Sequence, residues 1–163
     1  VSGSKRCARG PMTDPASRAL AFSDAGEPRF WWHHLPRGDY VPPLYANLSD
    51  KEWQLMQAWF EETNGTNLVG ECAVPIMSLL QGLVMGSSIR RIVQLGTHAG
   101  YSALLLGFFL RQMGASQGLC TFEIGEPLRD FTCGWIERAG LSGQIHVELR
   151  RSPDPLSPQL ARD

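Results

Sequence analysis

The sequence predicts an α/β fold in which three parallel strands alternate with helices in β-α-β-α-β order, with two helices ahead of the first strand. Three short runs indicate the strands, at residues 91–95, 118–123 and 144–149, and the first of them is nearly continuously apolar. Each of the first two runs is followed by a segment whose apolar residues have helical spacing. A strand made almost wholly of apolar residues is typical of a parallel sheet, which is buried on both faces.

The composition is that of an ordinary globular protein, with 43% apolar and 19% charged residues in a chain of 163, enough for one compact domain. A formal net charge of −1 gives no electrostatic reason to expect a nucleic acid or an anionic membrane as partner. The longest apolar run, residues 103–110, is far shorter than the roughly 20 residues that span a bilayer. The four cysteines show neither C-x-x-C pairing nor metal-ligand spacing, so we expect reduced thiols, no metal site and a cytoplasmic location.

The first 46 residues are rich in Pro, Gly, Ser, Arg and Asp and show no sustained period, which predicts an extended or partly ordered arm. Within this arm, the cluster from Phe30 to His34 either anchors the arm on the core or on a partner chain, or forms a lid over a substrate pocket. Trp32, His33 and His34 are the only local candidates for a pocket that would receive a substrate.

Residues 47–90 are expected to form a helical lead-in to the sheet. Ser49 and Glu52 have the spacing of a capping box, so a helix is predicted to begin there and to end at Asn64-Gly65. A second helix is predicted from about Ala73 to Met85.

Residues 91–152 contain the predicted strands and the helices between them. The helix after the second strand should open at Pro127 and stop at Gly140. The tail over residues 153–163 is rich in proline and is expected to lack regular structure.

The junction after the first strand is the strongest functional signal. Gly96 and Gly100 bracket a bend of the form Gly-x-x-x-Gly, in which the backbone can approach a ligand closely. The following helix directs its free N–H groups at that ligand, which favours a carboxylate or a phosphate. Neither Gly-x-Gly-x-x-Gly nor a P-loop is present, so the spacing predicts a nucleotide-like site of another kind.

Glu123 ends the second strand, at the same edge of the sheet as the bend. A carboxylate in this place can accept hydrogen bonds from both ribose hydroxyls of an adenosine group. A pyrophosphate cofactor would suit Glu123 equally well, so this residue does not by itself separate the cofactor classes.

Three segments together resemble class I S-adenosylmethionine-dependent methyltransferases: Val-Gln-Leu-Gly-Thr-His-Ala-Gly-Tyr-Ser-Ala-Leu, Cys-Thr-Phe-Glu-Ile and Arg-Ala-Gly-Leu-Ser-Gly-Gln-Ile-His-Val. The sequence is most similar to the catechol and caffeoyl-CoA type O-methyltransferase group, over residues 65–152. The resemblance concerns the N-terminal half of that family and implies an incomplete Rossmann-like three-layer sandwich. The motif is specific for the cofactor and not for a substrate. The cofactor-binding residues it implies are Gln94, Gly96, Thr97, His98, Gly100, Tyr101, Ser102, Glu123, Ile124 and Ser152.

The resemblance implies a role for each end of this site. At the methionine end, Gly96 and Gly100 would admit the cofactor, His98 and Tyr101 would line it, and Ser102 would bind its carboxylate. At the nucleoside end, the carboxylate of the second strand would hold the ribose, while the two remaining positions, 124 and 152, would lie against the adenine.

Two departures from the family's pattern stand out. Gln94 occupies a position that is usually acidic, so the contact to the cofactor's ammonium would lack charge assistance. The family's Asp that helps to bind Mg²⁺, its further metal ligands and its general base would all lie beyond Asp163. Mg²⁺ is therefore possible in the family, but its ligands are absent from this chain, and no catalytic residue is assigned.

The sequence thus predicts the cofactor-binding part of an S-adenosylmethionine-dependent methyltransferase that acts on a hydroxyl of a small molecule. The alternative is a noncatalytic S-adenosylmethionine-binding or degenerate module that works through a partner or a homodimer. A nicotinamide-dependent oxidoreductase is disfavoured by the glycine spacing. Residues 92–95 would form an apolar edge strand, so we expect a homodimer or a complementing chain to cover it.

Overall fold

A computed structural model describes residues 41–66, 68 and 74–151. The chain divides into two compact units, residues 1–53 and 54–163. The cluster from Phe30 to His34, most of the predicted arm, the proline-rich tail and Ser152 lie outside the described residues.

The first unit contains helix α2, Pro43–Ala46, and the start of helix α3, Asp50–Gly65. The short α2 lies within the arm that the sequence predicted to be extended or partly ordered. Its helix forms because a proline suits a helical first turn and because Leu44 and Tyr45 are both buried. The predicted capping box is confirmed at the start of α3. The Glu52 carboxylate accepts hydrogen bonds from the Ser49 N–H, at 2.7 Å, and the Ser49 hydroxyl, at 2.8 Å.

The second unit contains the remainder of the secondary structure in the order α4, β1, α5, β2, α6, β3. Helix α4 spans Val74–Gly86, as the sequence predicted for its second helix. The strands are β1, Ile92–Leu95, β2, Leu119–Glu123, and β3, Ile145–Leu149. Helix α5, Tyr101–Gln112, connects β1 to β2, and helix α6, Glu126–Arg138, connects β2 to β3.

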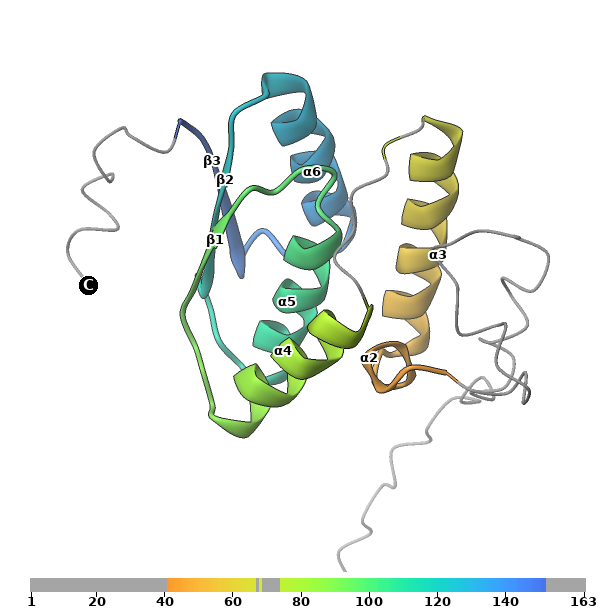
Figure 1. Cartoon of the computed structure of the whole chain (residues 1–163), viewed down its shortest axis with the longest axis vertical. Helices are drawn as coiled ribbons and strands as arrows, with labels where there is room; N and C mark the ends of the chain where they lie inside the picture. The colour runs from red at the N-terminus through yellow and green to blue at the C-terminus, as the bar shows by residue number, and fades with distance from the viewer. Residues whose placement is uncertain (1–40, 67, 69–73, 152–163) are drawn as a thin grey trace, which may run out of the picture. The chain divides into compact units, whose positions relative to one another are not determined.

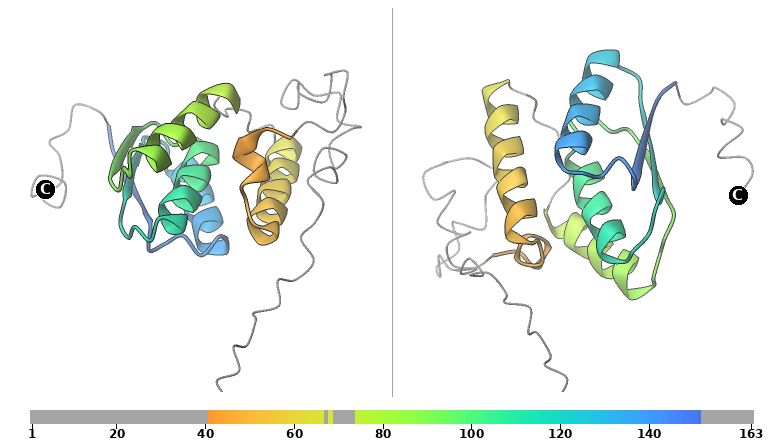
Figure 2. Two further views of the ribbon diagram at one scale, coloured as in Figure 1. Left: turned by 90° about the horizontal axis from the view of Figure 1, so that it is seen from below. Right: turned by 180° about the vertical axis from the view of Figure 1, so that it is seen from behind.

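The three strands form one parallel sheet in the order β1-β2-β3, which confirms the predicted incomplete Rossmann-like α/β fold. Both connecting helices lie on the same face of the sheet (Figures 1 and 2). Both β-α-β connections are expected to be right-handed, and the strands follow one another across the sheet in chain order. Each helix therefore returns over the same face. The described residues thus form two of the three expected layers.

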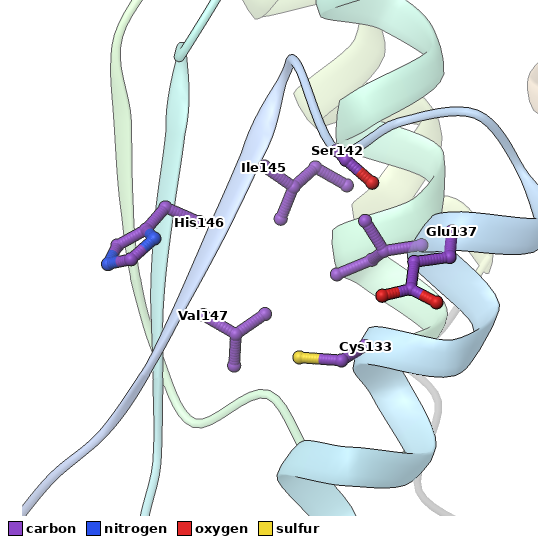
Figure 3. Close-up of a pocket in the computed structure, with 7 residues that line it drawn as sticks. Cys133, Glu137, Ser142, Ile145, His146 and Val147 are labelled. Carbon is purple, nitrogen blue, oxygen red and sulfur yellow. The ribbon is translucent and has the colours of Figure 1, made fainter.

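The two faces of the sheet differ in what covers them. The Gln94 side chain donates a hydrogen bond to Ser102 on α5, so the even-numbered residues of β1 face the helices. Val93 and Leu95 face the other way, because side chains alternate along a strand. In the described structure Val93 is 60% exposed and Leu95 is 75% exposed. On β3, which lies across the sheet, the same outer face carries His146, as its side chain points away from α6 (Figure 3).

Helix α5 forms the centre of the core. Its residues from Ala103 to Leu110 are all buried, because the sheet lies on one side of the helix and α4 contacts it on another. Gly107 allows the closest approach to β3: a Cβ at this position would lie 2.5 Å from Cδ1 of Ile145 and 3.0 Å from Cδ1 of Leu141. Because Gly107 has no side chain, α5 can pack this closely on β3.

None of the helices in the described ranges is long and apolar enough to cross a membrane. Over the same ranges, no group of three or more His, Cys, Asp or Glu side chains could hold a metal ion.

Candidate functional site

The bend between β1 and α5, residues 96–100, has an unusual backbone. Gly96, His98 and Gly100 all have positive φ angles, of 83°, 50° and 90°. The two glycines serve different purposes. A Cβ on Gly96 would meet nothing within 4 Å, so open space lies in front of it, whereas a Cβ on Gly100 would lie 2.8 Å from Cγ2 of Thr132. Gly96 therefore leaves room for a ligand, and Gly100 allows the bend to pack on α6.

Thr97 fixes the bend to the neighbouring strand. Its hydroxyl lies 2.6 Å from that of Thr121 and donates a hydrogen bond to the carbonyl oxygen of Phe122, at 3.0 Å. Both threonines are buried. The Thr97 side chain therefore points into the protein, so any contact of this residue with a ligand would come from its backbone.

The Glu123 carboxylate points toward the bend and binds it. Oε2 accepts a hydrogen bond from the His98 N–H at 2.7 Å, and Oε1 accepts from the N–H groups of Ile124 and Gly125 at 2.9 and 3.0 Å. Burial alone would raise the pKa of Glu123, but the hydrogen bonds from the N–H groups of Gly125, His98 and Ile124, with a smaller effect of the nearby Thr97 N–H, outweigh it and lower the pKa. This carboxylate is consequently charged at neutral pH although its residue is only 6% exposed.

These hydrogen bonds limit what Glu123 can offer to a ligand. A carboxylate has roughly four acceptor positions, and the three hydrogen bonds above occupy both positions on Oε1 and one on Oε2. The Thr97 N–H forms no hydrogen bond of this geometry within the described structure, so one position on Oε2 is left. The sequence suggested contacts to both ribose hydroxyls, whereas this geometry accommodates one hydroxyl unless a backbone contact is displaced.

Gln94 and Ser102 form a second polar group at the end of β1. Nε2 of Gln94 donates to the carbonyl oxygen of Gly96 and to Oγ of Ser102, both at 2.8 Å. This orientation of the amide is set by Gly96, because a carbonyl oxygen accepts only from the NH₂ side. Oε1 of Gln94 is buried and has no hydrogen-bond partner within the described structure. Since Oγ of Ser102 accepts from Gln94, its own hydrogen can be donated elsewhere.

Tyr101 and Ile124, two further residues predicted to contact the cofactor, differ in their exposure to solvent. Tyr101 is buried, with its ring centroid 5.6 Å from that of Trp59 and 6.1 Å from that of Phe60, so its ring belongs to the core. Ile124 is 73% exposed and directly follows the ribose-binding candidate Glu123. A large apolar side chain in water beside a polar site is suited to cover the face of a flat ring.

Sequence reasoning missed two side chains that contact the bend. On α3, Nε1 of Trp59 donates a hydrogen bond to the carbonyl oxygen of Ala99 at 2.8 Å. On α6, the hydroxyl of Thr132 donates a hydrogen bond to the carbonyl oxygen of His98 at 2.8 Å. Both side chains come from distant parts of the sequence, so no local pattern could have indicated them.

A separate pocket of about 180 Å³ lies between α6 and β3, and none of the predicted site residues lines it. Figure 3 shows the Cys133 thiol directed from α6 toward β3, where Val147 is its nearest labelled neighbour in this pocket. Burial raises the pKa of Cys133, with smaller opposing effects of Arg129 on one side and of Asp130 and Glu137 on the other. The thiol is therefore protonated at neutral pH, which makes it a poor nucleophile.

No protein-family model matches the sequence, and no curated protein matches it. Among solved structures, the chain is similar to an O-methyltransferase from Bacillus cereus in complex with SAH, with 27% identity and a TM-score of 0.48 over 62% of this chain and 43% of that one. It is also similar to the SAH-bound methyltransferase PaMTH1 of Podospora anserina, with 14% identity and a TM-score of 0.46 over 88% of this chain and 52% of that one. The chain thus spans about half the length of the structures it matches.

Proposed function

We propose that this chain binds S-adenosylmethionine at the bend between β1 and α5, and that it is the cofactor-binding part of a methyltransferase acting on a hydroxyl of a small molecule. The observation that carries the proposal is the pairing of two polar groups across the bend. Gln94 and Ser102 offer an acceptor and a donor on one side, and Glu123 offers a charged acceptor on the other.

The first group suits the amino-acid end of the cofactor. Oε1 of Gln94 lacks a partner, which is costly for a buried atom, and a shift of the side chain toward the open space at Gly96 would let it accept from a donor such as an ammonium group. The Ser102 hydroxyl can donate to a carboxylate, which also gains from lying at the N-terminus of α5. The open space in front of Gly96 would let such a group approach the backbone.

The second group suits the nucleoside. The Glu123 carboxylate can accept a hydrogen bond from a ribose hydroxyl at its remaining position, and Ile124 can lie against adenine. Two N–H groups of the bend, those of His98 and Gly100, already donate within the protein and are not available to a pyrophosphate.

S-adenosylmethionine would supply an activated methyl group on a sulfonium, and the protein's contribution is then binding and orientation. Gln94 and Ser102 would fix the amino-acid end, and Glu123 would fix the ribose. With both ends held, the sulfonium between them would face one direction. The residues that would receive the acceptor and remove its proton are not assigned in this chain.

Gln94 supports a second candidate function. An amide lacks the charge that an acidic residue would give to the ammonium contact, which fits a noncatalytic or degenerate S-adenosylmethionine-binding module acting through a partner. Transfer of a labelled methyl group to a panel of catechols, phenolics and sugars separates the two functions. Transfer to one acceptor supports the enzyme, and cofactor binding without transfer to any acceptor supports the module.

Calorimetric titration tests the binding proposal itself. We expect the chain to bind S-adenosylhomocysteine and not NAD. Gln94→Leu should weaken S-adenosylhomocysteine about tenfold, the cost of roughly one lost hydrogen bond. The same variant should bind 5′-methylthioadenosine as well as the wild type does, because that ligand lacks the amino-acid end. Preference for NAD, or an equal loss for both adenosine ligands, would count against the proposal.

We also propose that the β1 edge is covered by a second copy of the chain or by a complementing chain. Within the described residues, β1 pairs with β2 alone, and Val93 and Leu95 are exposed beside its open edge. Light scattering of the chain, alone or mixed with its complementing chain, should report a mass above that of the monomer. Leu95→Lys should reduce that mass. If the wild type is itself a monomer and the substitution leaves its mass unchanged, the proposal is wrong. The cytoplasmic location stays a prediction.

A further inference from the structure

Two buried side chains hold the carbonyl groups of the bend from two different helices. The indole of Trp59 donates to the carbonyl oxygen of Ala99. The hydroxyl of Thr132 donates to the carbonyl oxygen of His98, and Cγ2 of the same threonine lies against Gly100. Trp59 is 1% exposed and Thr132 is 0% exposed, so neither side chain can touch a ligand bound outside the bend.

The conformation of His98 explains why the bend needs such support. With φ at 50°, His98 is in the left-handed region, which is unfavourable for a residue with a Cβ and persists only when the surroundings enforce it. Three neighbouring backbone groups are held here: the N–H of His98 by Glu123, the carbonyl oxygen of His98 by Thr132, and the carbonyl oxygen of Ala99 by Trp59.

We propose that Trp59 and Thr132 are positioning residues that hold the bend in its ligand-binding conformation, and therefore set the affinity for a ligand that they do not contact. Through the His98 N–H, the same two contacts also fix the place of the Glu123 carboxylate. This inference rests on the proposed function, because the affinity concerned is that for the adenosine cofactor.

Two conservative substitutions test the contacts separately. Trp59→Phe keeps an aromatic ring against Phe60 and Tyr101 and removes the N–H. Thr132→Val keeps the shape against Gly100 and removes the hydroxyl. Trp53→Phe is the matched control, because Trp53 is a buried tryptophan of the same helix whose ring packs on Tyr45.

Two readouts distinguish positioning from a general loss of stability. The first is the dissociation constant for S-adenosylhomocysteine under conditions in which every variant is folded. We expect it to rise about tenfold in Trp59→Phe and in Thr132→Val, because without its donor the bend should hold the binding conformation only about a tenth of the time. The second is hydrogen exchange of the His98 amide in the absence of ligand, which should accelerate by at least that factor because this N–H reports on the opening of the bend. Trp53→Phe should change neither.

If both bend variants keep wild-type affinity and wild-type exchange of the His98 amide, or if the control changes both as much, the inference is wrong. Failure of the wild type to bind any adenosine ligand would instead overturn the proposed function. In that case, amide exchange still decides whether the two side chains hold the bend.

Discussion

Glu123→Gln tests whether the carboxylate at the end of β2 organises the bend. A carboxamide can keep an oxygen toward the N–H groups of Ile124 and Gly125, but its NH₂ then faces the N–H of His98, and that hydrogen bond is lost. A hydrogen bond to a charged group is worth about 1.5–3 kcal/mol, and the two retained bonds lose their charge assistance. We therefore expect the free energy of unfolding to fall by about 3 kcal/mol at neutral pH.

The pH dependence of this difference has a definite sign. The pKa of Glu123 is lowered in the folded state, so the stabilisation is fully present above its ordinary value of about 4.5 and is lost as the pH falls through the folded-state pKa below that value. The difference between wild type and Glu123→Gln should be largest at neutral pH and should close in the acid range. Urea unfolding at several pH values measures it.

Glu126→Gln is the control, because Glu126 lies three residues further along, is exposed, and forms a surface ion pair with Arg129. Its loss should cost less than about 1 kcal/mol. Equal destabilisation by the two substitutions would refute this account of Glu123. So would a loss for Glu123→Gln that does not diminish at low pH.

Three further outcomes are expected. Gly100→Ala should destabilise the fold by about 2–4 kcal/mol, because φ is 90° and the new Cβ would lie 2.8 Å from Thr132, whereas Gly134→Ala on α6 has open space and should be neutral or stabilising by up to about 1 kcal/mol. Ser49→Ala should cost about 1 kcal/mol by removing the cap of α3. Thermal or urea unfolding measures both, and a harmless Gly100→Ala would contradict the packing described. Of the 2′-deoxy and 3′-deoxy forms of S-adenosylhomocysteine, we expect titration to show that one binds like the parent and the other about tenfold more weakly, because Glu123 has one acceptor position left. Equal losses for both would contradict that limit.

The features that could be predicted from the sequence are those specified by neighbouring residues. The start of α3 follows from Ser49 and Glu52, three residues apart, and its geometry is as expected. The first parallel strand follows from a short apolar run, and the bend at Gly96 from the glycine that follows this strand. In each case the physical cause lies within a few residues, so a local pattern is sufficient.

The features that could not be predicted depend on contacts made after folding. The Trp59 contact to Ala99 spans 40 positions, and the Thr132 contact to His98 spans 34. The glycine at position 100 could be recognised as part of a bend, but the sequence could not disclose that α6 packs against it. Likewise, a glutamate at the end of a strand predicts a hydrogen-bond acceptor. How many of its acceptor positions are already occupied depends on which backbone N–H groups the folded bend directs at it.

The close packing at Gly107 constrains how this sequence can drift over evolution. A methyl group acquired at position 107 would lie 2.5 Å from Cδ1 of Ile145, and 3.0 Å from both Cγ1 of Ile145 and Cδ1 of Leu141. Valine at position 145 would remove the worst of these contacts while preserving a β-branched residue in the strand, and the other two would need shifts of a few tenths of an ångström. Descendants of this sequence should therefore pair alanine at 107 with a smaller residue at 145, and these two positions, one on a helix and one on a strand, should change together.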